Sequence, residues 1–191
     1  MSEPTSCCRV GDAYCDRCDL LALLASMHVI GVKRDEDGGL VVTMESAPEV
    51  MGCRACGVVA HAHGRVKVDR VDAPAMGHPV RVRWRARRWV CPEPACPVSS
   101  FVEQDQDVAA PQGKLTVRAC RWAIGQLRTE HASVNGIRGQ LGCGWRTVWD
   151  GNRPMLQAAD GEAHTVRQVV PSRRANPCTS PGPSLHPTRS L

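Results

Sequence analysis

The chain has 191 residues, of which 42 % are hydrophobic and only 4 % aromatic, with a formal net charge of +5. Its 11 cysteines are an odd number, and residues 1–19 are polar where a secreted protein has an apolar leader, which argues against a secreted disulfide scaffold. No stretch reaches the roughly 18 apolar residues of a membrane span. We therefore expect a cytoplasmic protein without a membrane partner, whose thiols bind metal or pack in the interior. Its small hydrophobic cores are expected to need additional stabilisation, such as a bound metal ion.

The charge is unevenly distributed along the chain. Residues 1–50 hold 4 basic and 9 acidic residues (net −5), residues 61–90 hold 8 basic and 2 acidic residues (net +6), and residues 114–155 hold 7 basic and 2 acidic residues (net +5). Two basic blocks behind an acidic head favour a polyanionic partner such as DNA or RNA. An ordinary solvated surface is the alternative.

The N-terminal segment, residues 1–48, contains an apolar run over residues 20–32. Its leucine-rich first part is typical of a short helix, and its β-branched end is typical of a strand. A turn signal over residues 35–39 and a second apolar run over residues 40–44 follow. Residues 28–45 are therefore predicted to form a β-hairpin.

Two cysteine pairs bracket the next region, residues 49–102. The first pair is a C-x-x-C-G knuckle, whose glycine permits the tight turn from which two thiolates grip one ion, and the second pair is C-x4-C. Together they offer the four thiolates of a closed structural zinc site, in the arrangement of a zinc ribbon. A redox dithiol or a rubredoxin-like iron site remains open, as does replacement of one thiol by a nearby histidine. The predicted ligands are Cys53, Cys56, Cys91 and Cys96, and the histidines are His61 and His63.

Two alternating segments, residues 66–69 and 80–87, are predicted strands, linked by residues 74–79. The second segment places four arginines on one face and apolar residues on the other. Such a row can contact phosphates, or it can be a solvated face paired with Asp69, Asp72 or the acidic head. The arginines are Arg81, Arg83, Arg85 and Arg87, and the apolar residues are Val80, Val82, Trp84 and Ala86.

The pair Cys15-x-x-Cys18 is a weaker metal signal, because no second pair with a similar turn accompanies it. For Cys15 and Cys18, packing in the interior or no specific role is favoured over a second metal site. Residues 103–113 are acidic, then punctuated by proline and glycine, and are predicted to be a linker.

Residues 114–157 change to a helical period. A first helix is capped by Thr116, a second is capped by Ser133 and stopped by Gly142, and a third follows. The third helix places Trp145, Val148 and Trp149 inward in the prediction. Three helices with a glycine turn indicate a helix-turn-helix, whose last helix enters the DNA major groove, although small bundles without a DNA role share the pattern. The groove-reading residues predicted here are Arg146, Thr147 and Arg153.

The residues of these regions resemble bacterial insertion-sequence transposases of the ISL-three group. The resemblance spans roughly residues 15–157 and rests on two separate regions in the family's order. The first resembles the zinc-finger domain, through residues 53–61, 87–89 and 91–96. The second resembles the DNA-binding helices, through residues 119–128, 130–134 and 145–149.

The resemblance implies an RNase H-like domain after the helices, with an Asp-Asp-Glu set that holds two divalent metal ions. After residue 157 this chain offers only Asp160 and Glu162, followed by a proline-rich stretch. Residues 158–191 do not look like family sequence and are predicted to be a disordered tail. We therefore expect no catalytic residue. Departures from the family pattern within the helices are Arg138, Gly139 and residues 150–152.

The expected fold class is α+β: a small zinc-ribbon-like β domain, then a three-helix helix-turn-helix domain, then the disordered tail. The expected function is binding of duplex DNA at the terminal inverted repeats of an insertion sequence, with structural Zn²⁺ and without strand transfer. A rival is a zinc-stabilised protein-interaction module that pairs with full-length transposase or with itself. A third reading, an active recombinase, requires metal-dependent DNA nicking.

Overall fold

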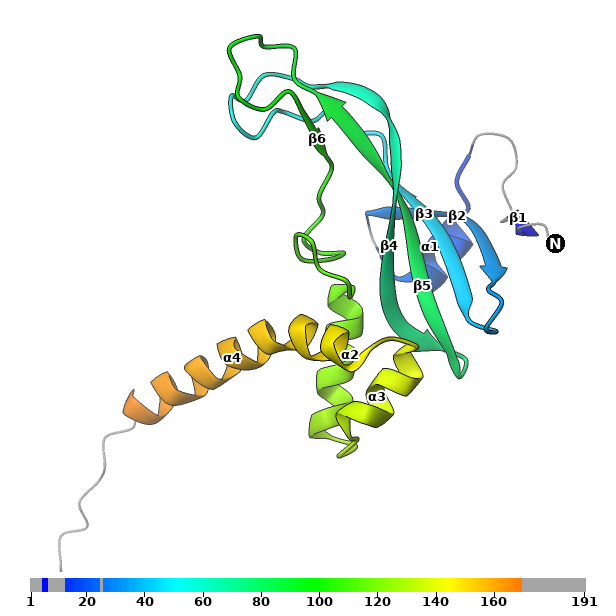
Figure 1. Ribbon diagram of the computed structural model, residues 1–191, viewed down its shortest axis with the longest axis vertical. Helices are drawn as coiled ribbons and strands as arrows, with labels where there is room; N and C mark the ends of the chain where they lie inside the picture. Colours follow the sequence, from blue (N-terminus) through cyan, green and yellow to red (C-terminus); the bar gives the residue numbers. More distant parts are fainter. Residues whose placement is uncertain (1–4, 7–12, 25, 170–191) are drawn as a thin grey trace, which may run out of the picture. The chain divides into compact units, whose positions relative to one another are not determined.

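The computed structural model describes residues 5–6, 13–24 and 26–169, and divides the chain into two compact units, residues 1–156 and 157–191. All side-chain features below belong to the first unit. The described elements, in chain order, are β1 (Thr5–Ser6), α1 (Asp16–Ala22), β2 (Met27–Arg34), β3 (Leu40–Ser46), β4 (His61–Ala75), β5 (His78–Val90), β6 (Ser100–Val102), α2 (Val117–Arg128), α3 (Val134–Leu141) and α4 (Trp145–Val169) (Figure 1).

The described strands form one mixed sheet in the order β1-β2-β3-β5-β4, with β6 paired to β5. Only β3 and β5 run parallel, through the register Leu40–Val80 to Met44–Trp84. The antiparallel pair β2–β3 confirms the hairpin predicted over residues 28–45. A first core lies on one face of this sheet and contains Leu24, Met27, Val29, Met44, Val82, Trp84, Ala86 and Val108.

The β4–β5 hairpin is longer than the sequence predicts. Residues 74–79, expected as a link, belong mostly to the strands, and only Met76 and Gly77 form the turn between Ala75 and His78. Both turn residues have positive φ, 52° and 78°, as a two-residue turn matched to the strand twist requires. A register shift between Asp72 and Ala75 accommodates the proline within the edge strand β4.

The prediction that residues 49–102 form a separate zinc-ribbon domain is wrong. The strands between the two cysteine pairs are β4 and β5, and β5 also pairs with β3 of the N-terminal hairpin. The cysteine region therefore shares one sheet and one core with residues 27–46. The alternation in residues 80–87 specifies a half-buried strand, but it does not say which strand lies beside it.

The predicted three-helix helix-turn-helix domain is also wrong. Helices α2 and α3 lie against the turn end of the β4–β5 hairpin (Figure 1). They share a second core with Val71 of β4, and Asp72 of the same strand is hydrogen-bonded to α2. The buried residues of this second core are Val71, Leu115, Ala119, Cys120, Ala123, Ile137, Leu141 and Val148. The helices therefore share their core with strand β4 and do not form a separate three-helix domain.

Two further expectations are corrected near the helices. The stretch 103–113, expected as a linker, is packed: Val108 and Ala109 are buried, and Val108 accepts a hydrogen bond from the amide of Val117. Helix α4 continues for 25 residues, through Pro154, so residues 158–169 are helical and not a disordered tail. Residues 170–191 of that predicted tail lie outside the described residues.

The apolar face of α4 also differs from its prediction. Val148 is buried, but Trp145 and Trp149 are 51 % and 42 % exposed. Within the part of the chain that is described, no helix combines the length and the apolar character needed to cross a membrane.

Candidate metal centre and basic groove

The first cysteine knuckle is a tight turn immediately before β4. The amide of Gly57 donates to the carbonyl of Cys53 over 2.8 Å, and the amide of Cys53 donates to the carbonyl of Val58 over 2.8 Å. Gly57 has φ +77°, a conformation that favours glycine. This turn places Cys53 and Cys56 on one side of the loop.

The second pair lies directly after β5. The amide of Cys91 donates to the carbonyl of Ser99 over 3.0 Å, and the amide of Cys96 donates to the carbonyl of Glu93 over 3.1 Å. The amide of Val98 points at the Cys96 sulfur over 3.4 Å, the kind of N–H···S contact that orients metal-bound thiolates. Because β4 and β5 are antiparallel, the two loops meet at the open end of the hairpin.

The four sulfurs lie within 4.8 Å of one another. The Cys53–Cys96 sulfur distance is 3.7 Å and the Cys56–Cys91 distance is 3.5 Å. Both exceed the roughly 2.05 Å of a disulfide. A tetrahedron with metal–sulfur bonds of about 2.3 Å has edges of about 3.8 Å, so the cluster has the dimensions of a four-thiolate site. The four cysteines can hold one metal ion.

The thiols of the cluster differ in acidity. Hydrogen bonds from the amides of Ala55 and Cys56 lower the pKa of Cys53 to about 7. At Cys91 the amide of Glu93 lowers the pKa, but burial and the neighbouring thiols together outweigh it and raise the pKa to about 12. Cys53 therefore loses its proton before Cys91, and a thiolate is the form that binds metal.

The other candidate ligands lie apart from this cluster. His61 and His63 are exposed at the start of β4 and are not members of it. Cys15 immediately precedes α1, and Cys18 packs from α1 against the first core. For Cys18 the packing role favoured by the sequence is the one observed.

The arginine row of β5 is oriented largely as the alternation predicts. Val80, Val82, Trp84 and Ala86 are buried, and Arg81 and Arg85 are exposed on the opposite face. Arg83 forms a two-bond pair with Asp69 of β4, with distances of 2.8 Å from both Nε and Nη2. Arg85 lies 3.8 Å from Glu45. The face therefore combines a cationic row with two carboxylates.

Arg87 differs from the other three arginines because it is only 9 % exposed. Its Nη1 donates to the carbonyl of Ala47 over 2.5 Å and its Nη2 to that of Ser46 over 3.0 Å. Its backbone amide donates to Glu103 over 2.6 Å. Arg87 thus ties β5 to the end of β3 and is not presented to a ligand.

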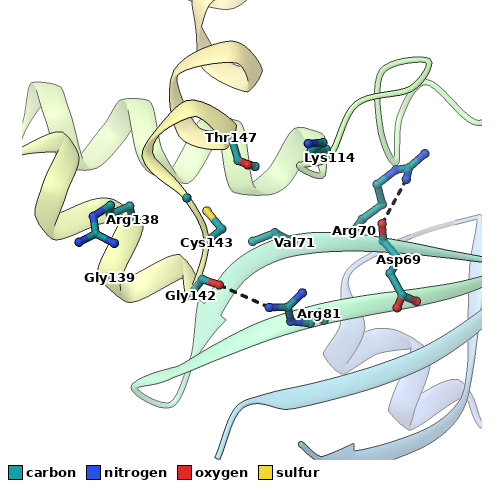
Figure 2. Close-up of a pocket in the computed structure, with 11 residues that line it drawn as sticks. Asp69, Arg70, Val71, Arg81, Lys114, Arg138, Gly139, Gly142, Cys143 and Thr147 are labelled. Atoms are coloured by element: carbon teal, nitrogen blue, oxygen red, sulfur yellow. Dashed lines mark hydrogen bonds between the residues drawn. The ribbon is translucent and has the colours of Figure 1, made fainter. Parts of the chain in front are cut away.

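A groove of about 880 Å³ lies between the turn end of the β4–β5 hairpin and the α3–α4 turn (Figure 2). Four cations from four segments line it. Three of the lining residues from the α3–α4 region are glycines, which have no side chain to fill the groove. Gly142 has φ +60° and stops α3, as the sequence predicts. The cations are Arg70, Arg81, Lys114 and Arg138, and the glycines are Gly139, Gly142 and Gly144.

The single carboxylate of the groove, Asp69, is already engaged. Its pKa is held below the usual range, first by the hydrogen bond from Arg83 and further by the charges of Arg81 and Lys67. The Arg70 guanidinium donates to the carbonyl of Asp69 over 3.1 Å. Its Nε is buried and has no hydrogen-bond partner among the described residues. The groove therefore carries an uncompensated positive charge.

The predicted groove-reading residues lie on α4. Arg146 and Arg153 are exposed, and Thr147 is half-buried and lines the basic groove. Sequence reasoning missed Arg70, Lys114 and Arg138 as site residues. The only available signal was the positive charge of residues 61–90 and 114–155, which indicates a charged surface but not which cations converge.

Comparison of the chain with protein-family models, with curated proteins and with solved structures finds no match.

Proposed function

We propose that the protein is a zinc-stabilised module that binds duplex DNA through a continuous basic surface. Zinc is the ion we assign to the four-cysteine cluster, because four thiolates at tetrahedral spacing favour a closed structural site. Its role is to hold the two loops together at the open end of the β4–β5 hairpin. We place the protein in the reducing cytoplasm, where such thiols stay available for metal.

The observation that carries the DNA proposal is the position of Arg81. This residue belongs both to the exposed row of β5 and to the groove beside α3 and α4. Its Nη2 lies 3.5 Å from the carbonyl of Gly142, which brings the two surfaces together. Successive residues on one face of a strand are about 6.8 Å apart, so the row presents cations at regular intervals to a phosphate backbone.

Charge balance along this surface supports a polyanion. The exposed face of β4 and β5 carries five cations against one carboxylate, Asp69, and the neighbouring carboxylate, Glu45 of β3, is buried; both carboxylates are paired with arginines. The groove adds three more cations. The eight cations are Arg65, Lys67, Arg81, Arg83 and Arg85 on the face, and Arg70, Lys114 and Arg138 in the groove.

The resemblance to transposases of the ISL-three group supports duplex DNA as the partner and points to the terminal inverted repeats of an insertion sequence as its target. In this proposal the chain binds element ends and performs no strand transfer. The residues proposed to contact bases lie on α4 and are Arg146, Thr147 and Arg153. The residues proposed to contact phosphates are the arginines of the β5 row other than Arg87, which are Arg81, Arg83 and Arg85.

The experiment measures affinity for a 20-base-pair duplex against salt concentration, with Arg81→Ala and a matched control, Arg34→Ala. Arg34 is also an exposed strand arginine, but it ends β2. We expect Arg81→Ala to reduce the slope of log affinity against log salt by about 0.9, the value of one phosphate contact. Arg34→Ala should leave the slope unchanged.

Arg87→Ala provides a second contrast. Because its guanidinium bonds to backbone carbonyls, the loss should appear in folding stability and not in the salt slope. Wild-type protein that binds no duplex, or binds it independently of salt, would overturn the DNA proposal and favour the protein-interaction module.

A further inference from the structure

Two tryptophans of α4 form an exposed stacked pair. The ring centroids of Trp145 and Trp149 are 5.9 Å apart and their planes are inclined by 8°. They are 51 % and 42 % exposed, whereas Trp84 and Trp89 are 3 % and 5 % exposed. In a chain with seven aromatic residues of the Phe, Trp and Tyr types, two exposed rings on one helical turn require an explanation.

The geometry of α4 explains why the second core leaves these rings uncovered. Val148 is buried, and a Cβ on Gly151 would lie 2.6 Å from the buried Leu115, so this side of α4 faces the core. At 100° per residue, Trp145 lies about 60° around the helix from Val148, and Trp149 about 100°. The rings therefore extend from the edge of the core into solvent.

Two arginines flank the rings on the solvent side. Arg153 follows Trp149 by four residues and Arg146 precedes it by three, so both lie within about 60° of Trp149 around the helix. Both are exposed. The exposed acid on this segment is Asp150. The face combines flat aromatic surface with net positive charge.

We propose that Trp145 and Trp149 form a stacking platform for unpaired nucleic-acid bases. On an unpaired strand Arg146 and Arg153 contact the adjacent phosphates, whereas on a duplex they are the residues proposed above to contact bases. Bases have the flat π-faces, and the backbone has the negative charge, that this face complements. Thr147, which lines the basic groove, lies about 160° around the helix from both rings, so the platform is a separate surface from the groove. This inference rests on the nucleic-acid binding proposed above.

A second copy of the chain fits this face less well. A two-fold interface brings the same patch of both copies together, so the arginine pair of one copy would meet an identical arginine pair. Like charges across an interface oppose association. An anionic, aromatic ligand satisfies both the rings and the arginines.

The test uses the full chain and two double variants. W145L/W149L keeps apolar bulk and helix propensity but removes the π-faces, and W145F/W149F keeps aromatic faces. Because both rings are exposed and Val148 is retained, both variants should fold, which circular dichroism checks. Affinity is measured for a blunt duplex, for the same duplex with an eight-nucleotide single-stranded overhang, and for oligo(dT). Quenching of tryptophan fluorescence in the wild type reports stacking directly.

We expect wild-type protein to bind the overhang duplex more tightly than the blunt one, with quenching on oligo(dT). W145L/W149L should lose about 5- to 150-fold in affinity for the overhang and the single strand, the loss of about one stacked base. It should bind the blunt duplex as the wild type does. W145F/W149F should recover most of the lost affinity.

If W145L/W149L binds overhang and blunt duplex as the wild type does, the stacking platform is wrong while duplex binding stands. If the wild type binds none of the three ligands, the proposed function fails and the platform with it. Sedimentation that shows a wild-type dimer, dissociated by W145L/W149L, would assign the rings to a protein interface and overturn the inference.

Discussion

Arg118 of α2 donates a hydrogen bond from its Nε to Oδ1 of Asp72 in β4 over 3.1 Å, and the Asp72 side chain is fully buried. The same carboxylate accepts from the Thr116 hydroxyl over 2.6 Å and from the amide of Ala73 over 2.9 Å. A second nitrogen of Arg118 donates to the carbonyl of Ala22. A buried carboxylate is stable only when it is paired and hydrogen-bonded. This pair therefore joins the helices to the sheet.

The first prediction concerns this link. Asp72→Ala leaves the Arg118 guanidinium without its carboxylate, and should lower the free energy of unfolding by about 3 kcal/mol, the low end for a broken buried pair because Arg118 keeps contact with water. Urea unfolding, followed by tryptophan fluorescence and by circular dichroism at 222 nm, measures the change. Both signals should shift together, since the helices share a core with β4.

The control is Asp69→Ala, which removes the exposed partner of Arg83 and should cost less than about 1 kcal/mol. Separate sheet and helix transitions in the wild type would contradict the shared core and restore two independent domains.

The second prediction contrasts two glycines of the helical region. A Cβ on Gly151 would lie 2.6 Å from Cδ1 of the buried Leu115, so Gly151→Ala should destabilise the protein by about 1–3 kcal/mol through overpacking. A Cβ on Gly139, within α3, meets nothing within 4 Å, so Gly139→Ala should stabilise by up to about 1 kcal/mol. Thermal unfolding of the two variants measures both signs. Equal effects would show that Leu115 does not pack against α4.

The third prediction concerns the metal. Purified protein should contain one zinc ion per chain, and a strong chelator should remove it and lower the melting temperature, because metal binding stabilises the folded loops. Cys91→Ser should lose zinc, whereas Cys143→Ser, a thiol lining the basic groove, should retain it. Elemental analysis gives the stoichiometry. Retention of zinc by a Cys53/Cys56 double variant would rule out the four-cysteine site.

The fourth prediction concerns pH. Burial raises the pKa of the Cys120 thiol to about 11, and its sulfur donates to the carbonyl of Gly151 over 3.4 Å. Because the folded-state pKa is raised, the stabilisation is fully present below the unfolded value of about 8.5–9 and is lost as pH rises toward 11. Wild-type unfolding free energy should therefore decline between pH 9 and pH 11.

Cys120→Ala should remove part of that alkaline decline, at the cost of a lower stability at pH 7. Urea titrations at pH 7, 9 and 10.5 separate the two effects. An identical decline in the variant would assign it to other groups, such as the Cys143 thiol, whose pKa burial also raises.

Features determined by neighbouring residues could be read from the sequence. Thr116 and Ser133 cap α2 and α3 by accepting from the amides three residues later, and Gly142 ends α3 in the left-handed conformation. The spacing within each cysteine pair implied two metal-binding turns, and the four sulfurs converge. These interactions span few residues of chain, so composition and spacing alone specify them.

Features determined by residues distant in the chain required the tertiary structure. The alternation of residues 80–87 correctly separated buried from outward positions, but only the pairing of β5 with β3 shows that the cysteine region shares a sheet with the N-terminal hairpin. Arg87 looked like its three neighbours in the sequence, yet it is buried against the carbonyls of Ser46 and Ala47. Likewise, Trp145 looked like a core residue and is exposed. In each case the outcome depends on which surface the rest of the fold brings against the residue, and periodicity does not contain that information.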